Sequence, residues 1–98
     1  MPHYVCLFNW TEQGITNVRE TVSRVDSAFE LGVSKYGVGL EKIYWTLGSH
    51  DLVAILEAPD DESIAAVALE LASAGNVRTT TLRAFDSGEM SRILGRLG

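Results

Sequence analysis

The chain has 98 residues, of which 46% are hydrophobic, and its 13 acidic and 8 basic residues give a net charge of −5. This length corresponds to one domain, so residues 1–98 are treated as a single unit. The acidic balance disfavours nucleic acid as a partner, because binding a polyanion requires a clustered basic face. No apolar run approaches the roughly 20 residues that cross a bilayer, and Met1–Tyr4 lacks the basic region of a signal peptide, so we expect no membrane partner and a cytoplasmic location.

The first predicted element is a strand over His3–Thr11, whose odd and even positions are both largely apolar. Such a strand is expected to be covered on both faces of its sheet. One layer of helices covers only one face, so the other face needs a second copy of the chain, a ligand or a further layer. Cys6 lies within this apolar run and is the only cysteine, which predicts a buried thiol in a reducing compartment.

A helix is predicted from about Ile15 to Tyr36, because its apolar residues recur at steps of three and four, the spacing of one helix face. Gly32 weakens the last part of this helix, so we expect a break or an irregular turn there. Gly37 accepts the left-handed conformation that often ends a helix. The apolar stripe consists of Ile15, Val18, Val22, Val25 and Phe29.

Two further strands are predicted over Val38–Leu47 and Asp51–Ala58, where apolar, β-branched and aromatic residues predominate. Gly48-Ser49 between them fits a two-residue hairpin turn, because glycine readily takes the positive φ that such a turn requires. Pro59 has no N–H to donate to a sheet, so the second of these strands ends before it.

The remaining chain predicts a helix, a strand and a short terminal helix. The helix runs from about Asp61 to Ala74, with Asp60 as its N-cap and Gly75 as its stop signal. The fourth strand covers Asn76–Phe85, and Asp86-Ser-Gly-Glu89 has the spacing of a capping box before the last helix.

The element order is therefore βαββαβ with an added helix, which predicts an α+β fold of the ferredoxin-like kind. In that fold an antiparallel sheet has the spatial order fourth, first, third, second strand, with both helices on one face. The opposite face would be apolar and bare, which soluble monomers rarely tolerate. We therefore expect the chain to pair with itself, as a homodimer of the dimeric α+β barrel type or as a higher homo-oligomer.

Four segments of the chain together resemble the GYD-domain family. They are N-W-T-E-Q-G-I at 9–15, Y-W-T-L-G-S-H-D-L-V at 44–53, E-A-P-D-D at 57–61 and G-N-V-R-T-T-T-L-R-A-F at 75–85. The resemblance implies a small protein of the dimeric α+β barrel type, and it implies no particular catalytic residues. His50 stands where the family usually has the tyrosine of its Gly-Tyr-Asp triplet, whereas Asp51 keeps the aspartate.

The predicted topology brings polar residues from several strands to one end of the sheet. The end of the first strand should lie near the starts of the third and fourth strands, and the hairpin joins the same end. A pocket there, with a few polar groups and an aromatic wall, would suit a small molecule. The candidate ligand-binding residues are Asn9, Thr11, Trp45, His50, Asp51 and Arg78.

Each candidate also has a structural interpretation, which the sequence leaves open. His50 fits a solvated residue beside the turn, and Asp51 fits an acceptor for backbone amides or a partner of Arg78. Trp45 fits an anchor in the core or in an interface. Because adjacent residues of a regular strand point to opposite faces, His50 and Asp51 are not expected to enter one pocket together.

The sequence contains few of the residues and motifs that bind metals or cofactors. Its two histidines, His3 and His50, and one cysteine show no paired-ligand spacing, so we expect no dedicated metal centre, and only a metal shared across a dimer stays open. It contains no phosphate-binding glycine loop and no dinucleotide fingerprint, so we expect no cofactor.

Three functions remain open from the sequence. The first is a homo-oligomeric barrel module that binds a small organic molecule in a sensing or accessory role. The second is a cofactor-independent enzyme, monooxygenase-like or isomerase-like, with His50 or Asp51 as its base. The third is a purely structural oligomerisation module.

Overall fold

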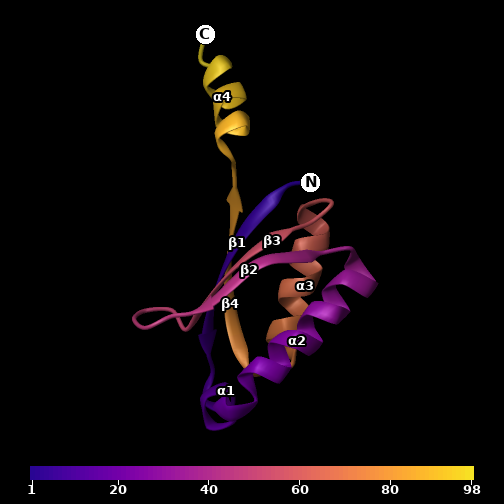
Figure 1. Cartoon of the computed structure of the whole chain (residues 1–98), viewed down its shortest axis with the longest axis vertical. Coiled ribbons are helices and arrows are strands. Elements are labelled where there is room, and N and C mark those ends of the chain that lie inside the picture. The colour runs from indigo at the N-terminus through magenta and orange to yellow at the C-terminus, as the bar shows by residue number, and fades with distance from the viewer.

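The computed structural model describes residues 1–98 and contains the predicted βαββαβ order with a terminal helix. Figure 1 shows these elements in chain order. They are β1 (His3–Trp10), α1 (Glu12–Thr16), a 3-10 turn (Val18–Glu20), α2 (Thr21–Leu31), a π-helical turn (Gly32–Tyr36), β2 (Gly39–Trp45), β3 (Leu52–Glu57), α3 (Asp61–Ser73), β4 (Val77–Ala84) and α4 (Ser87–Gly95).

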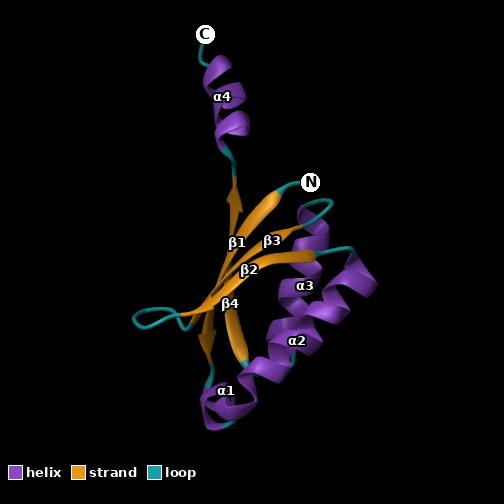
Figure 2. Ribbon diagram, in the orientation of Figure 1, coloured by secondary structure: helices purple, strands orange, loops and turns teal.

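The four strands form one antiparallel sheet in the order β2-β3-β1-β4, which confirms the predicted topology. Helices α2 and α3 lie side by side on one face of this sheet, as Figure 2 shows. The register pairs His3 with Glu57 at one end of β1 and Asn9 with Arg78 near the other. The fold is therefore α+β with a single helical layer, and the longest helix has 13 residues. None of the helices combines the length and hydrophobicity that crossing a bilayer requires.

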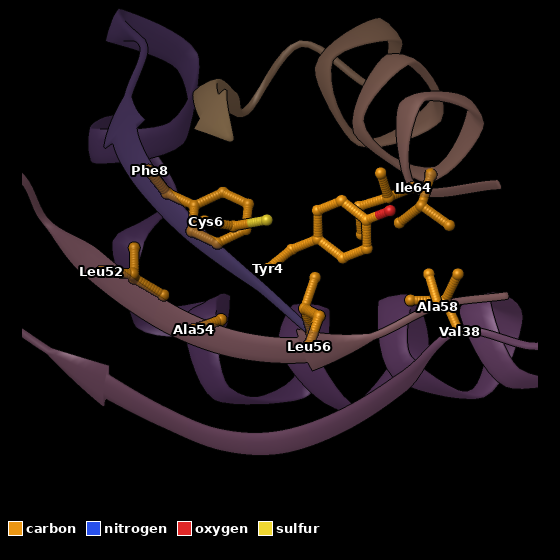
Figure 3. Packing of buried hydrophobic residues seen from close by; sticks show 10 residues of the cluster. Tyr4, Cys6, Phe8, Val38, Leu52, Ala54, Leu56, Ala58 and Ile64 are labelled. Carbon is orange, nitrogen blue, oxygen red and sulfur yellow. The ribbon is translucent and has the colours of Figure 1, made fainter. Parts of the chain in front are cut away.

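The core lies between the sheet and α3. The even positions of β1 and β3 point toward the helices, because successive side chains of a strand alternate between faces. Figure 3 shows how these side chains pack around the Tyr4 ring, and no buried residue of the core is charged. Cys6 is buried, as predicted. The core consists of Tyr4, Cys6, Phe8, Val38, Leu52, Ala54, Leu56, Ala58, Ile64 and Val67.

The opposite face of the sheet carries no helix and is called the open face here. Leu7 and Val53 are partners in the register and point to this face, as do Val5 and Ile55. On the edge strands, Leu82 is half exposed. The predicted bare apolar face is thus present, because both helices return to the same side of the sheet.

The prediction of one continuous helix from Ile15 to Tyr36 is wrong. The chain instead forms α1, a 3-10 turn, α2 and a π-helical turn. Thr11 caps α1 by accepting a hydrogen bond from the Gly14 N–H. The irregular turn expected at Gly32 is confirmed, and Gly37 ends it with a φ of 67°. Caps and glycines therefore break this segment into several short helical elements, although the apolar periodicity alone predicts one helix.

The prediction of a two-residue turn in the β2–β3 hairpin is also wrong, because β2 ends at Trp45 and β3 begins at Leu52. A wider loop is closed by the Thr46 N–H, which donates to the Asp51 carbonyl at 2.8 Å. The Thr46 hydroxyl adds a second hydrogen bond across the base of the loop, to the His50 carbonyl at 2.6 Å. Gly48 has the positive φ expected of it, 125°. The loop projects from the sheet in Figure 1.

Helix α4 stands beyond the end of the sheet and gives the molecule a longest dimension of 52 Å (Figure 1). The predicted capping box is present, since Asp86 accepts from the Glu89 N–H and Glu89 accepts from the Asp86 N–H. The apolar side chains Met90 and Leu94 are exposed on α4, and Leu97 is exposed just beyond its end. An apolar helix stripe without a partner is typical of a docking element.

Candidate functional site

Asn9 and His50 meet at the hairpin end of the sheet, as predicted. The side-chain Oδ1 of Asn9 accepts a hydrogen bond from His50 Nδ1 at 2.9 Å, and the side-chain Nδ2 of Asn9 donates to the Ser49 carbonyl at 2.7 Å. These bonds fasten the hairpin loop to the end of β1. They also occupy one ring nitrogen of His50, so its main contact is structural.

Asp51 bonds to the backbone of β1. Its Oδ2 accepts from the Trp10 N–H at 2.8 Å, and its own N–H donates to the Phe8 carbonyl at 2.8 Å. Of the two structural roles open to Asp51, the structure shows the backbone one and no ion pair with Arg78. Arg78 lies opposite Asn9 in the register, on the open face.

The other two predicted residues lie elsewhere. The Thr11 hydroxyl caps α1 and donates to the Gly75 carbonyl, so it joins the start of α1 to the α3–β4 connection. Trp45 lies on the helical side of the sheet, and its indole N–H donates to the Thr21 hydroxyl at 3.0 Å. The six predicted residues therefore do not form one pocket.

A groove lies between the helical face of the sheet and helices α2 and α3, with a volume of about 500 Å³. Most of its lining is apolar, and it includes Trp10, Val25, Phe29, Ile43 and Leu71. Thr21, the hydrogen-bond partner of Trp45, also belongs to the lining. Trp45 thus lies next to a cavity, but on the opposite side of the sheet from Asn9 and Arg78.

The groove exists because α2 does not seal against the sheet; none of its residues is fully buried. The apolar stripe of this helix does not reveal the groove, because periodicity shows which face turns to the sheet and not how closely the helix packs. The signal lay in Ser27 and Ala28, which line the groove and are too small to fill the space between helix and sheet.

Polar groups in the lining give the groove a distinct chemistry. Arg24 is engaged by the backbone, since its guanidinium donates to the Asn17 carbonyl at 2.8 Å. Glu70 pairs with Lys35 through Oε1, and this hydrogen bond lowers the pKa of the Glu70 carboxyl. Its other oxygen, Oε2, is buried without a hydrogen-bond partner. A carboxylate oxygen in this state can accept a hydrogen bond from a bound molecule.

The sheet order and the single helical layer define a small α+β module with an apolar groove between its sheet and its helices. The model of the GYD domain family matches residues 4–94, and the chain belongs to this family. The resemblance noted in the sequence is thereby confirmed.

A curated protein and a solved structure are similar to the chain. The glutamine synthetase and cystathionine beta-lyase binding protein of Thermus thermophilus is 30% identical over 90 residues, which cover 92% of this chain and 95% of that protein. The crystal structure of TTHA0845, also from Thermus thermophilus, matches with a TM-score of 0.56 and 24% identity, and covers 89% of this chain and 96% of that one. The structural likeness supports the α+β fold.

Proposed function

We propose that the protein is a homo-oligomeric cytoplasmic module that binds a small, mainly apolar organic molecule in a sensing or accessory role. The observation that supports this most directly is the groove of about 500 Å³ between the sheet and helices α2 and α3. Ligand pockets in proteins commonly span about 300–1,000 Å³ and combine an apolar lining with few polar groups.

The energetics of the groove favour an occupant. Removing apolar surface from water stabilises a protein or complex by about 25 cal/mol for each Å² buried. Phe29 and Val25 line the groove and are only partly buried, so part of their apolar surface stays accessible there. A ligand with a matching apolar body removes that surface from water and stabilises the position of α2.

Glu70 indicates which polar group the ligand carries. Its Oε2 is buried and lacks a partner, while Oε1 is held by Lys35. A hydroxyl or amine on the ligand would supply the missing hydrogen bond to this oxygen. We therefore propose an apolar molecule with one hydrogen-bond donor.

The fluorescent apolar probe N-phenyl-1-naphthylamine tests the groove. We expect its emission to rise on binding the wild-type protein, and to stay low with Ala28→Phe, because Ala28 lines the groove and a phenyl ring would fill it. Val22→Phe is the matched control on the same helix, since Val22 is 58% exposed and outside the lining. Equal probe binding by Ala28→Phe and wild type would refute the groove as the site.

The open face supports the homo-oligomeric part of the proposal. It presents Leu7, Val53 and Ile55 to one side of the sheet with no element of the same chain above them. A second copy is the occupant we propose, because the same apolar strip on both partners is self-complementary about a two-fold axis.

Light scattering on the purified chain measures this association. We expect a mass of at least twice 10.7 kDa for wild type and a shift toward 10.7 kDa for Ile55→Glu. Leu69→Glu is the control, because Leu69 is exposed on α3 away from the open face. A wild-type monomer at micromolar concentration contradicts the proposal.

A second candidate function is binding to another enzyme as an accessory protein. The curated relative is named for binding glutamine synthetase and cystathionine beta-lyase, and α4 here offers the exposed apolar residues Met90 and Leu94. Purified glutamine synthetase and cystathionine beta-lyase, immobilised on a biosensor, are the probes. Binding that is lost in Met90→Ser/Leu94→Ser and kept in Leu69→Ser supports this function, and absence of binding to both enzymes removes it.

An enzymatic role receives less support from the geometry. The two residues considered as bases, His50 and Asp51, both make hydrogen bonds that hold the hairpin to β1. Neither residue lines the groove.

A further inference from the structure

Three ionisable side chains meet on the open face, at the end of the sheet away from the hairpin. His3 Nε2 lies 2.9 Å from Glu41 Oε1 and 3.1 Å from Glu57 Oε1. One ligand atom from each side chain lies within 4.8 Å of the other two. The three residues come from three adjacent strands, β1, β2 and β3, so the cluster depends on the sheet and not on a local sequence motif.

The sheet geometry explains how Glu41 reaches the other two. His3 and Glu57 are direct partners in the β1–β3 register. On the other side of Glu57 the register partner is Gly39, where an added Cβ would have no atom within 4 Å. This leaves open space beside Glu57. A β-bulge between Leu40 and Lys42 makes Glu41 the additional residue of β2, and bulges commonly redirect a side chain in this way.

The donor atoms of the cluster, one imidazole nitrogen and two carboxylate oxygens, suit a cation. Two carboxylates approach one imidazole, and a neutral imidazole has a single N–H to donate. A metal ion can accept the imidazole nitrogen and both carboxylate oxygens at the same time, which one imidazole N–H cannot do.

We propose that His3, Glu41 and Glu57 form a site for a divalent transition metal, with Zn²⁺ as the ion that best matches this ligand set. Zinc binds imidazole nitrogen at about 2.0–2.1 Å and carboxylate oxygen at about 2.0–2.2 Å. Ligand atoms around such an ion are separated by roughly 3 Å, which is the spacing between His3 Nε2 and both glutamates.

Three protein ligands leave at least one coordination position for water or for a group from outside the chain. The site lies on the open face, so a second copy covering that face could supply the remaining ligand. The proposal departs from the sequence-based expectation of no metal centre, because residues 3, 41 and 57 show no ligand spacing along the chain. The metal-site proposal does not depend on the groove, so an experiment that refutes one of the two proposals does not refute the other.

Isothermal titration of the metal-free full-length chain with ZnCl₂ tests the proposal. The protein must carry no affinity tag, because a polyhistidine tag binds zinc and the positive N-terminus contributes to the electrostatics of Glu57. We expect saturable binding by wild type and loss of that binding in His3→Ala, in Glu41→Gln and in Glu57→Gln. His50→Ala is the matched control, since it removes the only other histidine and leaves the cluster intact.

Thermal unfolding with and without ZnCl₂ provides a second readout, because an ion that binds only the folded chain raises its Tm. The rise should occur in wild type and in His50→Ala and be absent in Glu57→Gln, whose circular dichroism verifies that it folds. A wild-type chain that binds no zinc contradicts the proposal. Zinc binding that survives all three cluster substitutions overturns it as well.

Discussion

Among single residues, Tyr4 combines deep burial with a polar end. Its side chain is 2% exposed, and its hydroxyl donates to the Asp61 carboxylate at the start of α3. Burial first, and the hydrogen bond to Asp61 second, raise the pKa of Tyr4 to about 12 from an ordinary value of 10.0. Ionisation of Tyr4 is therefore coupled to unfolding.

The sign of this coupling gives a prediction. Because the pKa is higher in the folded chain, the stabilisation is complete below pH 10 and is lost as the pH rises through about 12. The free energy of unfolding, measured with urea, should fall over that pH interval by more in wild type than in Tyr4→Phe. Tyr44→Phe serves as the control, since Tyr44 is 56% exposed. A parallel decline in wild type and Tyr4→Phe would contradict the coupling.

Asp51 is the residue of the candidate set with the clearest structural task. Replacing it with alanine leaves the Trp10 N–H without its acceptor, and we expect a loss of about 1–3 kcal/mol in the free energy of unfolding. Chemical denaturation measures the loss. Asp26→Ala, an exposed position on α2, should change stability by less than about 0.5 kcal/mol. If both variants lose the same amount, charge rather than the Trp10 bond is responsible.

For single residues, the sequence could predict which ones lie close together but not which groups they hydrogen-bond. The strand order places Asn9, His50 and Asp51 together, and the structure agrees. Their exact partners are main-chain groups, the Ser49 carbonyl and the Trp10 N–H, whose positions depend on a loop wider than the predicted turn. Pattern rules describe side-chain faces and carry little information about such loop geometry.

At the scale of elements, the contact between α1 and the α3–β4 connection is the tightest backbone approach. A Cβ on Gly14 would lie 1.9 Å from the Asn76 carbonyl oxygen, which no side-chain rotation can relieve. We expect Gly14→Ala to destabilise the fold by about 3 kcal/mol or more, as overpacking against backbone does. Gly39→Ala is the control, because a Cβ there meets nothing within 4 Å. Thermal melts of the two variants should differ clearly, and similar Tm values would show that α1 shifts freely.

Periodicity, together with the stop signals, located the four strands, α3 and α4, but it misjudged the segment before β2 and the β2–β3 connection. It joined α1, α2 and the two short turns into one helix, because the apolar step continues across Asn17 and Gly32. The interruptions fall at Asn17, whose backbone leaves the helical conformation, and at Gly32, where the π-helical turn begins. The predicted hairpin turn was too short, because Asn9, from a different strand, holds a wider loop.

At the scale of the whole molecule, α4 is set apart from the domain it follows (Figure 1). Deleting residues 86–98 removes one exposed ion pair, Arg83 with Glu89, and no part of the core. We expect the free energy of unfolding to change by less than about 1 kcal/mol. The comparison requires a dilution at which light scattering gives the same state for both chains. A larger loss would mean that α4 packs on its own domain.

The overall arrangement was predictable because a βαββαβ order has one compact antiparallel solution. What the order could not predict is how closely each helix approaches the sheet, and hence the groove beneath α2. It also could not predict the meeting of His3, Glu41 and Glu57, since the bulge in β2 decides the position of Glu41. Both features arise from three-dimensional spacing between residues distant in sequence.

The indole bond between Trp45 and Thr21 has a practical consequence. The chain has two tryptophans, and both adjoin the groove: Trp10 lines it, and Trp45 reaches across to α2. Intrinsic fluorescence is therefore an internal reporter of this region and needs no label. A compound that enters beneath α2 alters the polarity around one indole and the hydrogen bond of the other. An emission shift can thus rank compound libraries by occupancy before any biological activity is known.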